Sequence, residues 1–88
     1  MTAQEAIVTN SLGLHARAAA RFVHLASQFA SQVRVTKGSR TMDGKSILGL
    51  LLLAAARGSV LTLAAEGPDE ADAVAALTAL VERGFEGA

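Results

Sequence analysis

The sequence predicts an α+β fold, a two-layer open-faced sandwich with a four-stranded antiparallel sheet and three helices on one face. Three observations support this fold. Short β-branched segments alternate with segments of helical period in the order β-α-β-β-α-β-α. Each helical segment has one apolar stripe, which a sheet can cover from one side. A chain of 88 residues has room for only one domain, spanning residues 1–88.

The first half of the chain contains three predicted strands and one helix. A strand over residues 4–9 leads through a loop at residues 10–13 into a helix over residues 16–28. The strands Gln32–Lys37 and Arg40–Asp43 then form a hairpin. The apolar face of the helix is expected to consist of Ala18, Ala19, Phe22, Leu25, Ala26 and Phe29.

The second half contains a short helix, a strand and a final helix. Ser46 is a good N-cap for a helix over residues 47–56, and a strand follows at residues 59–66. Asp69 is expected to cap the last helix, and Gly84 to end it. The apolar stripe of this helix comprises Ala73, Val74, Leu77, Leu80 and Val81.

The composition excludes several classes of function. The chain has no cysteine, which excludes disulfides, thiolate metal sites and thiol catalysis. Eight basic residues balance eight acidic ones, and the only aromatic residues are three phenylalanines, so nothing indicates nucleic-acid binding. No apolar stretch is long enough for membrane insertion, and no signal pattern is present. We therefore expect a cytoplasmic protein.

The two histidines do not suggest a metal site. His15 and His24 are nine residues apart, a spacing that would place them on opposite sides of a helix. The chain contains neither a Gly-x-x-x-x-Gly-Lys phosphate loop nor a nucleophile elbow. We expect no metal, no cofactor and no self-contained enzyme.

The segment Leu12-Gly13-Leu14-His15-Ala16-Arg17 has the residues for phosphoryl chemistry. A helix N-terminus offers free N–H groups and a positive dipole end, which together favour an anion. The dipole and Arg17 both disfavour the imidazolium form, which leaves His15 a lone pair for nucleophilic attack. A phosphoryl group on His15 would meet N–H donors and a guanidinium. On this chemistry alone, a capping or surface histidine is the simpler interpretation.

Gly13-Leu14-His15-Ala16-Arg17, followed by a helix, resembles the active-site motif of the histidine-containing phosphocarrier (HPr) family. This family belongs to the bacterial phosphoenolpyruvate-dependent phosphotransferase system. Lys45-Ser46-Ile47-Leu48-Gly49 resembles its regulatory-serine motif, and residues 58–70 resemble its fourth strand and last turn. The resemblance covers nearly the whole chain. It implies a carrier that accepts a phosphoryl group on His15 from phosphorylated enzyme I, with support from Arg17, and passes it to enzyme IIA proteins.

Ala18 departs from the family pattern, which usually has proline after the arginine. Alanine restores an N–H donor in the first helical turn and gives up some stiffness. We expect the site to survive, with a less rigid loop before His15. The resemblance also implies that Ser46 is a regulatory phosphoserine and that an HPr kinase/phosphorylase is a partner. The alternative is that Ser46 is only an N-cap.

The helix after Ser46 has more leucines than one side can bury. Leu48 and Leu52 should be at least partly exposed, and such a patch on a small protein usually marks docking. The resemblance implies that this region, including Ile47, contacts protein partners. The side facing the sheet is expected to consist of Ile47, Leu50, Leu51 and Ala54.

The first helix is expected to contribute a polar face to docking. Arg17, Arg21 and His24 lie on this face and could meet acidic partner surfaces. For His24 on its own, a solvated or partner-facing position is the expected role.

Two other classes of function remain. One is a regulatory interaction module controlled by Ser46, including a nitrogen-type regulatory branch, against which the intact segment around His15 argues. The other is a ferredoxin-like ligand- or RNA-binding domain, against which the lack of aromatic and Cys-x-x-Cys motifs argues. The sequence does not distinguish a sugar-uptake carrier from a regulatory one. We expect a monomer.

Overall fold

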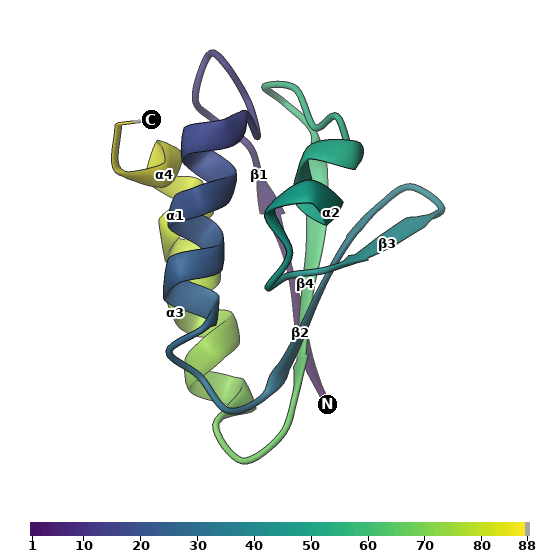
Figure 1. The fold of residues 1–88 in the computed structure, drawn as a ribbon, viewed down its shortest axis with the longest axis vertical. Coiled ribbons are helices and arrows are strands. Elements are labelled where there is room, and N and C mark those ends of the chain that lie inside the picture. Colours follow the sequence, from purple (N-terminus) through teal and green to yellow (C-terminus); the bar gives the residue numbers. More distant parts are fainter. Residues whose placement is uncertain (88) are drawn as a thin grey trace.

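The computed structural model describes residues 1–87. A four-stranded antiparallel sheet forms one layer, and the helices cover one face of this sheet (Figure 1). The strand order is β1-β4-β2-β3, and the predicted fold class and element order are confirmed. The elements are β1 (Thr2–Ile7), α1 (Ala16–Ala26), β2 (Gln32–Lys37), β3 (Arg40–Asp43), α2 (Ile47–Leu52), β4 (Val60–Glu66), α3 (Glu70–Glu82) and α4 (Gly84–Gly87).

The sheet is amphipathic because its strands alternate. In β2, the buried Val33 and Val35 point toward the helices, and their neighbours Gln32 and Arg34 are exposed. In β4 the buried residues are Leu61, Leu63 and Ala65. The register pairs Val35 with Leu63, so the two strands place their apolar side chains in one core. None of the helices within residues 1–87 has the length and apolar character needed to cross a bilayer.

The bounds of β1 and α1 differ from those expected. β1 covers Thr2–Ile7 instead of residues 4–9, because its pairing with β4 already begins at Thr2 and Ala65. α1 ends at Ala26 instead of residue 28, because the N–H groups of Gln28 and Phe29 bond three residues back in a tighter turn. The predicted apolar face of α1 is buried at Ala18, Ala19, Phe22 and Ala26, and half-buried at Leu25 and Phe29.

α2 is shorter than predicted and buries fewer residues. It ends at Leu52, and Ala54 has a φ of 50°, which does not continue a right-handed helix. Lys37 donates to the carbonyls of Leu53 and Ala54, at 3.3 and 3.2 Å, and Arg40 donates to that of Leu52 at 2.7 Å. These two cations fix the C-terminal end of the helix.

The expectation that Ile47, Leu51 and Ala54 face the sheet was wrong. Ile47 is 43% exposed, Leu51 is 36% exposed, and Ala54 is also exposed. A helix of six residues has fewer than two turns, so few of its side chains can share one buried side. The buried pair is Leu50 and Leu53.

The start of α3 is linked to the turn between α1 and β2. Asp69 occupies the N-cap position but makes no side-chain cap to α3, contrary to expectation. Its carboxylate accepts hydrogen bonds from the N–H groups of Ala30 and Ser31, at 2.9 and 3.0 Å, and from the Ser31 hydroxyl at 2.5 Å. The Ser31 hydroxyl and the Ala30 N–H are the main causes that hold the pKa of Asp69 below its ordinary value. The predicted apolar stripe of α3 is buried throughout.

A left-handed turn follows α3. Gly84 has a φ of 67°, which agrees with its expected role as a helix stop. Phe85 and Glu86 also have positive φ, at 54° and 58°, so the segment labelled α4 in Figure 1 is not a right-handed helix. Phe85 is fully buried, which the sequence did not indicate.

Candidate functional site

His15 is the N-cap of α1, and its ring faces the N-terminus of that helix. Nδ1 accepts a hydrogen bond from the backbone N–H of Arg17 at 3.2 Å, and this contact is open to solvent. A nitrogen that accepts an N–H must hold a lone pair, so the bond corresponds to the tautomer with its proton on Nε2. Nε2 is enclosed and has no hydrogen-bond partner within the described residues. Nδ1 is therefore the nitrogen available for reaction.

The loop before His15 is held by a contact with a distant part of the chain. The Leu14 N–H donates to the Ala55 carbonyl at 2.9 Å, and the Leu14 side chain is buried. Gly13 has a φ of 66°, and a Cβ at that position would lie 2.4 Å from the same Ala55 oxygen. Asn10 closes the loop by donating its amide to the Gly13 carbonyl at 2.7 Å. Only glycine fits at position 13 without moving the loop.

The N-terminus of α1 provides a set of donors beside Nδ1. The first helical hydrogen bond joins the Ala19 N–H to the His15 carbonyl at 2.8 Å, so the N–H groups of residues 16–18 precede it. The Arg17 side chain is exposed, and the ion pairs within residues 1–87, Met1–Glu70 and Arg83–Glu86, do not involve it. The arrangement offers an anion several N–H groups and a guanidinium.

A groove of about 510 Å³ runs along α1 next to Arg17. Its lining includes the three polar residues that the sequence placed on one helix face, Arg17, Arg21 and His24. His24 is exposed, but Arg21 is half-buried and donates to the carbonyls of Phe85 and Glu86, at 2.7 and 2.8 Å. The remaining lining residues are Ala20, Leu25, Leu80 and Glu86.

α2 presents exposed apolar side chains. Leu48 is 67% exposed and Leu52 is 52% exposed, which confirms their predicted exposure. Ile47 and Leu51 extend this surface, which we call the α2 patch (Ile47, Leu48, Leu51 and Leu52). Leu12, which is 73% exposed in the loop before His15, was not predicted as part of a docking surface; its place in a polar loop was the available signal.

Ser46 caps α2 as predicted. Its Oγ accepts the Gly49 N–H at 3.0 Å, and its carbonyl accepts the Leu50 N–H at 3.1 Å. The residue is half-buried and directly precedes the α2 patch. A modification of this hydroxyl would therefore change both the cap and the neighbouring surface.

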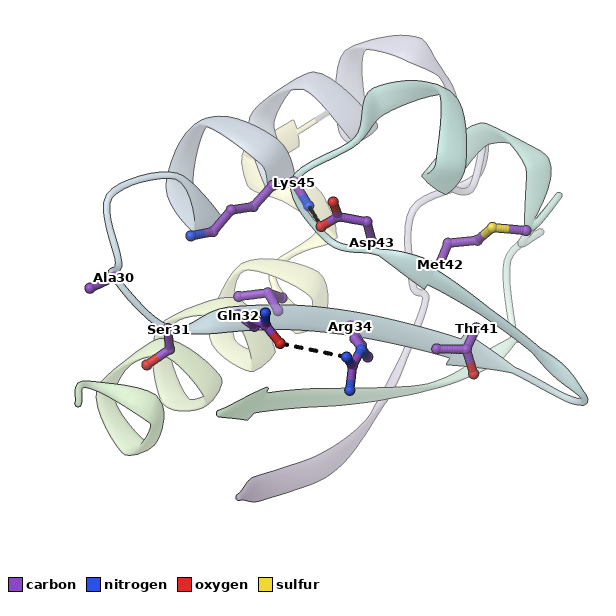
Figure 2. Close-up of a pocket in the computed structure, with 9 residues that line it drawn as sticks. Ala30, Ser31, Gln32, Arg34, Thr41, Met42, Asp43 and Lys45 are labelled. Atoms are coloured by element: carbon purple, nitrogen blue, oxygen red, sulfur yellow. Dashed lines mark hydrogen bonds between the residues drawn. The ribbon is translucent and has the colours of Figure 1, made fainter. Parts of the chain in front are cut away.

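A second groove, of about 390 Å³, opens between β2 and the end of β3 (Figure 2). Asp43 accepts the Lys45 backbone N–H at 2.9 Å at its rim, and Arg34 lies on the open face of the sheet. None of the predicted site residues lines this groove. Among residues 1–87, no three His, Asp or Glu side chains are grouped so as to hold a metal ion.

Comparison with known proteins assigns the chain to a family. The model described as the PTS HPr component phosphorylation site matches residues 2–83. Phosphocarrier protein HPr of Neisseria meningitidis serogroup A is 51% identical, over 97% of this chain and 96% of that protein. Phosphocarrier protein NPr of Shewanella violacea is 41% identical, over 94% and 91%. The crystal structure of HPr-C-His from Thermoanaerobacter tengcongensis superposes with a TM-score of 0.94 at 43% identity, covering 98% of this chain and 97% of that chain; an HPr dimer from that organism is a further match. With its His15 segment, fold and sequence all in agreement, the chain belongs to the HPr family of phosphocarrier proteins of the phosphotransferase system.

Proposed function

We propose that the chain accepts a phosphoryl group on Nδ1 of His15 from phosphorylated enzyme I and delivers it to enzyme IIA proteins. The observation that supports this most directly is the lone pair of Nδ1, which faces the N-terminus of an eleven-residue helix. A nucleophile and an anion-binding set of donors therefore share one location.

The transfer needs no cofactor. The Nδ1 lone pair attacks phosphorus, the bond between phosphorus and the donor atom of enzyme I breaks, and the electron pair stays on that donor atom. Nε2 keeps its proton. The Arg17 N–H, which donates to Nδ1 in the free protein, becomes a donor to a phosphoryl oxygen, and the Arg17 guanidinium adds a second. Delivery to enzyme IIA is the same step in reverse, with the acceptor atom of that protein as nucleophile.

Docking is assigned to two exposed surfaces, the α2 patch and the groove along α1. The α2 patch offers apolar contact, Arg17 offers positive charge and His24 offers an exposed polar side chain along the groove of α1. Apolar anchors at the centre of an interface and charges at its edge are typical of transient recognition. Arg21 is also proposed to contact partners, although its guanidinium already bonds to the chain itself.

The test is incubation with enzyme I and labelled phosphoenolpyruvate. The wild type and His24→Ala should take up label that is lost in acid and kept in alkali, as expected of a phosphorus–nitrogen bond. His15→Ala should take up none, and Arg17→Ala should slow uptake while the melting temperature stays unchanged. Label on folded His15→Ala would refute the assignment.

A regulatory role for Ser46 is the second candidate, supported by the position of its hydroxyl beside the α2 patch. A phosphate there adds about −1.5 to −2 charges. Removing water from these charges when a partner docks costs free energy, so partner binding should weaken. Ser46→Asp should fold, because an anion suits a helix N-terminus, and should be phosphorylated more slowly at His15. Ser46→Asn, a neutral cap, is the matched control. Equal rates for both variants would count against regulation by charge, and phosphoserine made by a cognate HPr kinase/phosphorylase is the final test.

The carrier is proposed to act as a monomer, which sedimentation of the free protein at assay concentrations would check. Transfer to enzyme IIA proteins of a sugar-uptake system, compared with those of a nitrogen-type branch, would identify the branch it serves. Faster transfer to one class would assign the carrier to that class.

A further inference from the structure

Arg21 connects α1 to the left-handed turn at residues 84–87. One guanidinium nitrogen, Nη1, donates to two successive carbonyls, those of Phe85 at 2.7 Å and Glu86 at 2.8 Å. Arg21 lies one helical turn after Arg17 on α1. The contact therefore joins the polar face of the helix that His15 caps to the far end of the described chain.

The backbone of this turn is unusual and needs external support. All four residues have positive φ: Gly84 at 67°, Phe85 at 54°, Glu86 at 58° and Gly87 at 89°. Residues other than glycine rarely adopt this conformation, and successive ones more rarely still. Two features oppose its relaxation, the complete burial of the Phe85 side chain and the bonds from Arg21.

The same turn packs against the loop that leads to His15. A Cβ added to Gly84 would lie 3.5 Å from Cβ of Asn10 and 3.7 Å from Oγ1 of Thr9. The Thr9 hydroxyl also donates to the Glu82 carbonyl at 3.4 Å. Figure 1 shows this turn, the β1–α1 loop and the α2–β4 loop together at one end of the molecule.

The turn thus supports the His15 segment from both sides. Before His15 it packs on the loop that Asn10 closes through the Gly13 carbonyl, and after His15 it is tied to Arg21. Glu86, whose carbonyl Arg21 binds, also lines the groove beside Arg17. The position of the turn therefore affects both the loop and the groove.

From these contacts we infer that Arg21 is a positioning residue for phosphoryl acceptance: it clamps the turn at residues 84–87, which in turn fixes the loop before His15 and the groove beside Arg17. The inference rests on the proposed function for its catalytic part. The hydrogen bonds that the Arg21 side chain makes within residues 1–87 go to the turn and not to His15, so its effect must pass through the turn.

The experiment compares Arg21→Met, which keeps the apolar stem and loses the donors, with Arg21→Lys, which keeps a charge and donors. Arg34→Met removes an exposed arginine from the open sheet face and is the charge-matched control. Amide hydrogen exchange on the free protein and kcat and KM for phosphorylation by enzyme I are measured. Arg21→Gln replaces Arg21→Met if the latter does not fold.

For Arg21→Met we expect amide exchange at residues 84–87 and at Gly13 to accelerate at least about threefold, with a similar fall in kcat. Arg21→Lys should keep amide exchange and kcat close to the wild-type values, and Arg34→Met should change neither amide exchange nor kcat. A raised KM with unchanged exchange and kcat would overturn the inference and make Arg21 a partner contact only. If the wild type accepts no label, the proposed function fails, whereas the exchange measurement still tests the clamp.

Discussion

The leucines of α2 allow docking and stability to be separated within one helix. Leu50 is fully buried, whereas Leu48 is 67% and Leu52 is 52% exposed. Leu50→Ala should cost about 2–5 kcal/mol, from lost burial and the cavity it leaves. The whole domain is expected to hold only about 4–13 kcal/mol. Since each kcal/mol lowers Tm by roughly 4–8 °C in a domain of this size, the variant should melt at least about 8 °C lower.

Leu48→Ala and Leu52→Ala should instead stay within about 0.5 kcal/mol of the wild type. The change in helix propensity is the same at all three positions, so it cancels in the comparison. If each exposed leucine contributes about 1 kcal/mol to docking, its removal should raise KM for phosphorylation by enzyme I about fivefold. Leu51 is also exposed, contrary to expectation, so Leu51→Ala should behave like Leu48→Ala and Leu52→Ala.

Urea unfolding gives the free energy of unfolding of each variant, and phosphorylation kinetics on the same samples give its KM. A loss of stability in Leu48→Ala as large as that in Leu50→Ala would place Leu48 in the core instead. A wild-type KM in both Leu48→Ala and Leu52→Ala would contradict the docking role, because the exposed leucines would then serve neither the core nor the partner.

Three further predictions concern the supports of the site and the core. Gly13→Ala should lower the free energy of unfolding by more than the roughly 1–2 kcal/mol that a left-handed backbone costs a residue other than glycine, because the added Cβ would meet the Ala55 carbonyl. Gly38→Ala is the control, because Gly38 has a φ of 60° with open space around it and the variant should lose only the stability that the backbone conformation costs. Equal melting temperatures for the two variants would contradict the clash of the position-13 Cβ with the Ala55 carbonyl. Thr78→Val should raise stability by about 1 kcal/mol, because the buried Thr78 hydroxyl has no partner among the described residues; a lower Tm would contradict this. Asp69→Asn should melt lower than the wild type at pH 7. Because the pKa of Asp69 is depressed in the folded protein, the unfolded chain binds the proton first as pH falls, so the difference in Tm should shrink below about pH 4; a constant difference down to pH 3 would contradict it.

The features predicted correctly are those encoded locally. The stripe of α3 and the alternation of β2 and β4 repeat over several turns or pairs, and each repeat supports the same assignment. His15 as a cap also follows from its immediate neighbours. The resemblance to the family motif then points to His15 as the phosphorylated residue, which the pattern of its neighbours alone does not do.

The features missed depend on contacts between distant residues. The length of α2 is set by Lys37 and Arg40, which bind its last carbonyls from a hairpin, and helical periodicity contains no such information. Asp69 has the residue type of a cap, but Ala30 and Ser31 compete for its carboxylate. Propensity likewise assigns right-handed backbone to Phe85, where burial and Arg21 hold the opposite hand.

Ala18 shows why this distinction matters for the site. With alanine in place of the usual proline, local stiffness in the first turn of α1 is reduced, and the sequence predicted a less rigid loop before His15. The structure places the supports of that loop elsewhere, in the Leu14–Ala55 hydrogen bond and the close approach of Gly13 to the Ala55 carbonyl. Ala18 itself is fully buried, so α1 is anchored at that position by packing. The order of the His15 ring should therefore depend less on the residue at position 18 than on these contacts with the α2–β4 loop, which lies at the same end of the molecule as the β1–α1 loop (Figure 1).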